Sequence, residues 1–267
     1  MLIDSHCHLD RLDLSAFDGS LDALLEVARG AGVGAMLAVG IDLASSREMI
    51  RLATRHADVF ATVGVHPLQT ESLPLPDETE LQTLGASDVV VAIGETGIDG
   101  HYGGDNLDWQ RESFRIHARV ASRLRKPLVV HTRDARAETL ALLRAHTDPA
   151  VGGVLHCFTE DWATASAGLE LGFYISFSGI VTFRNAGDLR EIAARVPMDR
   201  LLVETDAPWL APVPYRGKTN RPHYVAEVAR CIAALRGMDL DHFNARVAEN
   251  FARLFRIEVP TLAGGVT

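Results

Sequence analysis

Residues 1–10 read MLIDSHCHLD, in which a short apolar run, Leu2–Ser5, leads directly into His6-Cys7-His8. The run predicts a β-strand, and because successive side chains on a strand point to opposite faces, His6 and His8 share one face. Two imidazoles at this spacing can bind one metal ion. The pair alone is a weak signal, since the chain contains 11 histidines. The stretch therefore predicts a strand whose C-terminal end carries two candidate ligands.

The same arrangement recurs along the chain, where apolar runs alternate with amphipathic segments of helical period. Alternating strands and helices predict parallel strands joined by crossover helices, and eight such units in 267 residues predict an α/β fold, a (β/α)8 TIM barrel. The predicted strands cover Leu2–Ser5, Ala35–Val39, Phe60–Val65, Val89–Ile93, Pro127–Val130, Gly153–Leu155, Tyr174–Phe177 and Leu201–Val203. The helices that we expect cover Leu21–Arg29, Ser45–His56, Asp108–Arg125, Ala135–His146, Asp161–Leu171, Asp188–Arg195 and Pro222–Arg236.

An open doubly wound sheet is the alternative architecture. It would place a glycine-rich phosphate loop after an early strand, but Gly30-Ala31-Gly32-Val33-Gly34 precedes a predicted strand instead. We expect one domain over residues 1–258, followed by a loose tail at residues 259–267.

Composition narrows the class of protein. Hydrophobic residues make up 47% and charged residues 23% of the chain, as in an average globular protein. The net charge of −9 argues against a broad basic surface for nucleic acid, so a polyanionic substrate must be held locally. The apolar run Ala31–Ile41 is too short for a membrane span, and we expect no membrane partner. Three scattered cysteines (Cys7, Cys157 and Cys231) and an opening without the pattern of a secretion signal favour the cytoplasm.

Other ionisable residues also follow predicted strands. They are Glu95, His131, His156 and Asp206. The carboxyl ends of barrel strands meet at one mouth, so these side chains should converge with His6 and His8. Four imidazoles and two carboxylates are enough for two metal ions with one carboxylate bridging them. Such a site can activate water and polarise a phosphoryl or carbonyl oxygen, which indicates a binuclear hydrolase.

Seven segments resemble, in order, the motifs of the TatD-type metal-dependent deoxyribonucleases, over residues 3 to about 255. They are His6-Cys7-His8-Leu9-Asp10, Gly64-Val65-His66-Pro67, Gly94-Glu95-Thr96-Gly97-Ile98-Asp99, His131-Thr132-Arg133-Asp134, His156-Cys157-Phe158-Thr159, Glu204-Thr205-Asp206-Ala207-Pro208-Trp209-Leu210 and Pro214-Tyr215-Arg216-Gly217-Lys218-Thr219-Asn220.

The resemblance implies a barrel of the metal-dependent hydrolase (amidohydrolase-like) type with two divalent ions, magnesium, manganese or zinc. It implies removal of nucleotides, 3′ to 5′, from the ends of single-stranded nucleic acid, above all DNA. Carried over to this sequence, His6, His8 and Asp206 would hold one ion, His131 and His156 the other, and Glu95 would bridge them. Because Glu95 stands where many amidohydrolases have a carbamylated lysine, lactonase- or dihydroorotase-like activities are less favoured.

Three residues are candidates for catalysis: Glu95, Asp206 and His66. Asp206 could orient or deprotonate the attacking water in addition to binding metal. His66 precedes a proline at the mouth, and we expect it outside the ligand set, in contact with phosphate or transferring a proton. Glu204 is either a hydrogen-bond partner of a histidine ligand or one half of a buried ion pair with an arginine.

Substrate contacts are expected from His66, Arg133, Tyr215 and Arg216, since guanidinium groups suit phosphate and aromatic rings can stack on bases. For Phe158 and Trp209 we expect core packing instead. Three departures from the family pattern affect the substrate contacts. Leu68 stands where a second polar or histidine residue is frequent, and Gly100-His101 stands where an aromatic residue is usual. Asn220-Arg221-Pro222 stands where Asn-Glu-Pro is common.

Two other functions fit parts of the same evidence. A metal-dependent ester or amide hydrolase, such as a D-aminoacyl-tRNA deacylase, would use the same ligand set. A non-catalytic scaffold with structural metals fits less well, because structural sites usually saturate their metals with protein ligands.

Overall fold

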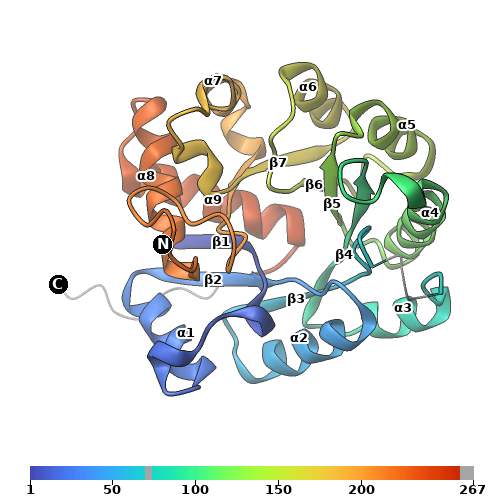
Figure 1. The fold of residues 1–267 in the computed structure, drawn as a ribbon, viewed down its shortest axis with the longest axis horizontal. Helices are drawn as coiled ribbons and strands as arrows, with labels where there is room; N and C mark the ends of the chain where they lie inside the picture. The colour runs from blue at the N-terminus through green and yellow to red at the C-terminus, as the bar shows by residue number, and fades with distance from the viewer. Residues whose placement is uncertain (70–73, 259–267) are drawn as a thin grey trace.

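The computed structural model describes residues 1–69 and 74–258, and its centre is an eight-stranded parallel sheet (Figure 1). The strands pair in chain order, each with the next. They are β1 Leu2–Cys7, β2 Val33–Ala38, β3 Val59–Val63, β4 Val90–Asp99, β5 Leu128–Arg133, β6 Gly153–Leu155, β7 Phe173–Phe177 and β8 Leu201–Val203. The eight predicted strands are thus confirmed, although β1, β4 and β5 extend past their predicted ends.

The first and last strands meet and close the sheet. Cys7 pairs with Ala207 in a parallel bridge, and the His8 N–H donates to the Ala207 carbonyl at 2.9 Å. Two residues before His6 on β1, the buried Asp4 carboxylate accepts hydrogen bonds from the Thr205 N–H at 2.8 Å and the Thr205 hydroxyl at 2.6 Å. These contacts produce the expected (β/α)8 barrel.

Nine α-helices lie outside the strands in the described part of the chain (Figure 1). Several begin at an aspartate that accepts a hydrogen bond from a backbone N–H of the first turn, as Asp42, Asp161 and Asp239 do. The helices are α1 Leu21–Gly30, α2 Leu43–Arg55, α3 Glu78–Gly85, α4 Leu107–Leu124, α5 Arg136–His146, α6 Trp162–Glu170, α7 Gly187–Arg195, α8 Val225–Leu235 and α9 Leu240–Phe255. Helices α3 and α9 add to those that we expected from the sequence.

The core lies between the helices and the strands and inside the barrel. Strands β1, β2 and β4 are buried at every position. Phe243 and Phe251 of α9 are fully buried, so this last helix completes the packing around β1 and β8. None of the described helices has the length and apolar character that crossing a membrane would need. The tail expected at residues 259–267 lies outside the described residues.

Candidate metal centre

The extra length of β4 and β5 places two candidate ligands inside the strand ladder. Glu95 lies in the middle of β4, and Gly97 pairs with His131 of β5. A Cβ atom on Gly97 would lie only 1.9 Å from the His131 carbonyl oxygen, and the φ of Gly97 is +151°. Glycine therefore permits the close approach that brings His131 beside Glu95.

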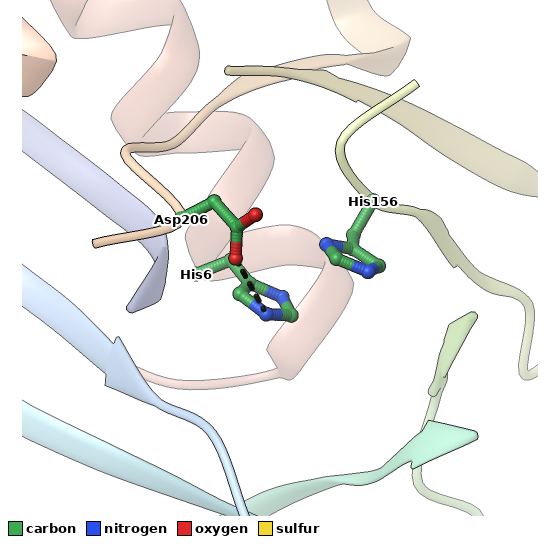
Figure 2. A group of neighbouring side chains, drawn as sticks. All are labelled: His6, His156 and Asp206. Carbon is green, nitrogen blue, oxygen red and sulfur yellow. Dashed lines mark ion pairs between the residues drawn. The ribbon is translucent and has the colours of Figure 1, made fainter. Parts of the chain in front are cut away.

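The first candidate ligand group brings together residues from β1, from β4 and from the segment after β8, and consists of His6, His8, Glu95 and Asp206. The Nε2 atoms of His6 and His8 are 3.2 Å apart, which confirms that both rings share a face. Glu95 Oε2 lies 3.4 Å from His6 Nε2, and Asp206 Oδ1 lies 3.4 Å from His8 Nε2. Figure 2 shows the Asp206 carboxylate directed at a nitrogen of the His6 ring, and the His156 ring is stacked on the face of His6.

The second ligand group is arranged around the other oxygen of the same carboxylate and consists of His66, Glu95, His131 and His156. Glu95 Oε1 lies 3.3 Å from His66 Nε2, 3.4 Å from His131 Nδ1 and 2.8 Å from His156 Nε2. Each oxygen of Glu95 thus faces one group. Three sets of side chains bring three possible ligand atoms within 4.8 Å of one another. Two of them are subsets of these groups, His6-His8-Glu95 and His66-Glu95-His131, and the third, His6-His156-Asp206, combines residues of both groups.

The spacing of these atoms fits coordination of a cation. Two nitrogen ligands about 2.1 Å from one zinc ion, at an angle between right and tetrahedral, lie roughly 3.0–3.4 Å apart, and the two Nε2 atoms of His6 and His8 are 3.2 Å apart. His156 Nε2 is buried and lacks a hydrogen-bond partner although it lies 2.8 Å from Glu95 Oε1. Both observations suit donor atoms that surround an ion.

Protonation states of the two carboxylates favour a cation. Burial opposes ionisation of Glu95, but the positive charge of His156 and a hydrogen bond from His131 outweigh it and hold the pKa well below its ordinary value. Burial likewise opposes ionisation of Asp206, yet the hydrogen bond from His8 and the nearby imidazoles lower its pKa. Both groups are therefore carboxylates at neutral pH.

The histidines fall into two classes. Burial lowers the pKa of His6 and of His66, so these imidazoles are neutral, as metal ligation requires. For His8 and His131, burial is outweighed by neighbouring carboxylates and the pKa is raised. For His156, burial is outweighed by Glu95 and Glu204, and the pKa lies well above its ordinary value. A cation bound at this place would displace that proton, which couples metal binding to pH.

Two further carboxylates orient histidines from behind. Glu204 Oε1 lies 3.3 Å from His156 Nδ1 and also accepts the Cys157 N–H at 2.8 Å, which confirms the predicted partnership with a histidine. Asp99 Oδ2 lies 3.0 Å from His131 Nε2 and was not singled out from the sequence. Its position four residues after Glu95 on the same strand, and so on the same face, was the available signal.

These groups open into a cavity of about 710 Å³ at the carboxyl ends of the strands. Besides the candidate ligands, its lining includes two arginines, Arg11 and Arg133, and two aromatic residues, Tyr102 and Trp209. The arginines place positive charge at the rim of a cavity inside an acidic protein. The cavity lining therefore carries positive charge beside the candidate ligands.

Comparison with known proteins identifies the family, because residues 3–256 match the family model described as TatD related DNase. The chain belongs to this family. It is 49% identical over 261 residues to "Uncharacterized metal-dependent hydrolase YcfH" of Escherichia coli K12, covering 98% of each chain. It is 34% identical over 253 residues to "3'-5' ssDNA/RNA exonuclease TatD" of Klebsiella pneumoniae, covering 93% of this chain and 96% of that one. The solved structure of YjjV, a TatD homologue of Escherichia coli, superposes with a TM-score of 0.88 at 27% identity, and the match covers 96% of this chain and 98% of YjjV.

The residues expected to contact substrate separate into two sets. His66 and Arg133 line the cavity. Tyr215 and Arg216 are absent from its described lining: Tyr215 stacks on Tyr224 with ring centroids 3.9 Å apart, and the Arg216 guanidinium lies over Phe183 at 3.8 Å. The loop after β8 therefore packs these side chains against aromatic neighbours.

The predictions of core packing for Phe158 and Trp209 have different outcomes. Phe158 is fully buried, as expected. Core packing for Trp209 was wrong: the ring is 47% exposed and lines the cavity beside His8, because residue 209 follows the end of β8 where the chain leaves the barrel. We expected His66 to lie outside the ligand set. Its Nε2 nevertheless lies as close to Glu95 Oε1 as the Nδ1 of His131 does.

Proposed function

We propose that this chain is a two-metal phosphodiesterase that removes nucleotides, 3′ to 5′, from the end of single-stranded DNA. The observation that carries the proposal is the position of Glu95, whose two oxygens face two separate groups of imidazoles at the floor of the cavity. The relative from Klebsiella pneumoniae, named as a 3′-5′ exonuclease, supports the substrate class and the polarity.

The proposed ligands divide between the two groups. His6, His8 and Asp206 would hold one divalent ion, and His131 and His156 the other, with His66 as a further donor and Glu95 between them. Magnesium, manganese and zinc are the candidate ions, and when bound they would polarise a phosphoryl oxygen and acidify water.

Other steps are assigned to the side chains themselves. Asp206 is ionised and borders the cavity, so we assign it the proton of the attacking water. The Arg133 guanidinium, at the rim, would bind a phosphate of the retained strand. Glu204 and Asp99 hold the His156 and His131 rings in the orientation that ligation needs.

The test is a time course of metal-stripped protein on a 5′-labelled single-stranded DNA, with magnesium, manganese or zinc restored separately. We expect a metal-dependent ladder that shortens from the 3′ end, and its loss in Glu95→Gln and His131→Ala. Full activity in both variants, in preparations shown to be free of contaminating nuclease, would refute the proposal. Absence of cleavage by wild-type protein that has rebound metal would refute it too, and would make a D-aminoacyl-tRNA ester the next substrate to test.

A further inference from the structure

Two exposed aromatic side chains border the cavity. Among the residues that the structure describes, seven large apolar side chains are exposed, and the aromatic ones are Tyr102, at 69%, and Trp209, at 47%. Both line the cavity above the candidate ligands. Exposed apolar surface gathered at a cavity usually marks a binding contact, whereas single exposed side chains elsewhere need no explanation.

The two aromatic residues are attached to different ligand groups, Trp209 through its ring and Tyr102 through its backbone N–H. The Trp209 ring meets His8 edge to face, with centroids 5.0 Å apart, and so borders the first group. The Tyr102 N–H donates to Asp99 Oδ1 at 2.7 Å, and Asp99 Oδ2 lies 3.0 Å from His131 of the second group. Each aromatic residue is therefore fixed to one end of the candidate metal centre.

Barrel topology places these ends on opposite sides of the mouth. Trp209 follows β8, which closes on β1, and Tyr102 follows β4, which pairs with β5. In a closed barrel of eight strands in chain order, the β8–β1 edge lies across from the β4–β5 edge (Figure 1). The bridging Glu95 lies between them, since its two oxygens face the two groups.

The surroundings of Tyr102 suit a nucleobase followed by a phosphate. Arg133 places its guanidinium 4.6 Å from the centroid of the Tyr102 ring, which covers one face and leaves the exposed remainder beside a positive charge. A flat, partly exposed ring next to a cation can stack a base and attract the phosphate that follows it. A scissile phosphodiester held at the centre necessarily has one nucleoside on each side.

We propose that Trp209 and Tyr102 stack the two nucleobases that flank the scissile phosphate, one base on each ring. This inference rests on the proposed function and adds to it the positions of the bases. It requires bases whose faces are free, so paired ends are poor substrates. It also makes two adjacent bases the unit that is recognised, with little preference for their identity, because every base has a stacking face.

The test compares kcat/KM on three 5′-labelled single-stranded DNAs: one intact, one abasic at the 3′-terminal nucleotide, and one abasic at the penultimate nucleotide. With wild-type protein, we expect each abasic position to lower kcat/KM about 5- to 100-fold. Trp209→Ala should lower the rate on intact DNA by a similar factor and become indifferent to one abasic position. Tyr102→Ala should become indifferent to the other position.

Matched variants separate stacking from general damage. Trp209→Phe and Tyr102→Phe keep a ring and should retain sensitivity to both abasic positions. Leu235→Ala truncates an exposed apolar side chain on α8, away from the cavity lining, and should behave as wild type.

Three outcomes would overturn the inference. The first is that both alanine variants stay fully sensitive at both positions, and the second is that both lose sensitivity at the same position. In either case the protein still cleaves DNA, so the proposed function survives. The third is that wild-type protein cleaves none of the three DNAs, and then the proposed function fails together with the stacking.

Discussion

His117 offers a sharp test of how the barrel supports its mouth. This residue of α4 is fully buried, and its Nε2 accepts the Val65 N–H at 2.9 Å while Nδ1 donates to the Ser113 carbonyl at 2.7 Å. The contact with Val65 requires the neutral imidazole, because an imidazolium carries a proton on both nitrogens and cannot accept the Val65 N–H. Val65 directly precedes His66, so a neutral His117 anchors the segment that delivers His66 to the cavity.

Burial sets the size of the effect. It lowers the pKa of His117 from 6.5 to about 4, although the hydrogen bond to Ser113 partly opposes the shift. Between these two values the unfolded chain binds a proton that the folded chain does not, so stability falls as the pH falls. The expected loss is about 2 kcal/mol on going from neutral pH to pH 5 and about 3 kcal/mol once the pH is below 4.

Urea unfolding of wild-type protein and His117→Gln, at pH 7 and at pH 5, isolates the contribution of His117 to the pH dependence of stability. All other titrating groups are common to both proteins, so they cancel in the difference between the two free energies of unfolding. At pH 7 the wild type should be the more stable, and at pH 5 its advantage should shrink by about 2 kcal/mol. An advantage of the same size at both pH values would refute the reasoning.

Three further predictions concern the metal centre and the strand beside it. Saturation with a divalent ion at about 100 times its Kd should add about 2.7 kcal/mol per site and raise the Tm by about 5–10 °C for each occupied site, as followed by calorimetry with and without chelator. Glu95→Gln should show little of this shift, and an equal shift in both proteins would contradict the bridging role. Asp99→Asn should weaken metal binding about 10- to 100-fold in competition with a chromogenic chelator, because Asp99 orients His131; unchanged affinity would remove that role. Gly97→Ala should lower the free energy of unfolding in urea by more than about 3 kcal/mol, because its Cβ would meet the His131 carbonyl. Gly104→Ala, whose Cβ would meet nothing within 4 Å, should lower it by less than about 0.5 kcal/mol. Equal losses in the two variants would show that the close contact is not responsible.

The fold could be predicted because its signals are local. Each strand is a short apolar run, and the first, Leu2–Cys7, also shows the alternation that puts His6 and His8 on one face. Helix α3 was missed because its eight residues, Glu78–Gly85, contain few apolar positions. The extension of β4 to Asp99 was missed because Gly94 and Gly97 read as the end of a strand, while in the barrel they permit close contact with the neighbouring strands.

The candidate ligands could be located, but their surroundings could not. Strand ends converge in any closed barrel, so Glu95 and His131 were expected together without knowledge of side-chain geometry. The roles of Trp209 and Tyr102 depend on how the loops fold back over the mouth, and no periodic pattern carries that information. The assignment of residues 1–258 to one domain stays a prediction.

The contact between Asp4 and Thr205 has a consequence for biosynthesis. These residues are 201 positions apart, and their hydrogen bonds lie directly beneath His6 and Asp206. On the ribosome, a growing chain acquires His6 and His8 about 200 residues before Asp206, which follows only after β1 to β8 have been translated. The first ligand group is therefore completed at the same step that seals the barrel, so a chain arrested before β8 has neither a closed barrel nor a complete set of donors for that group.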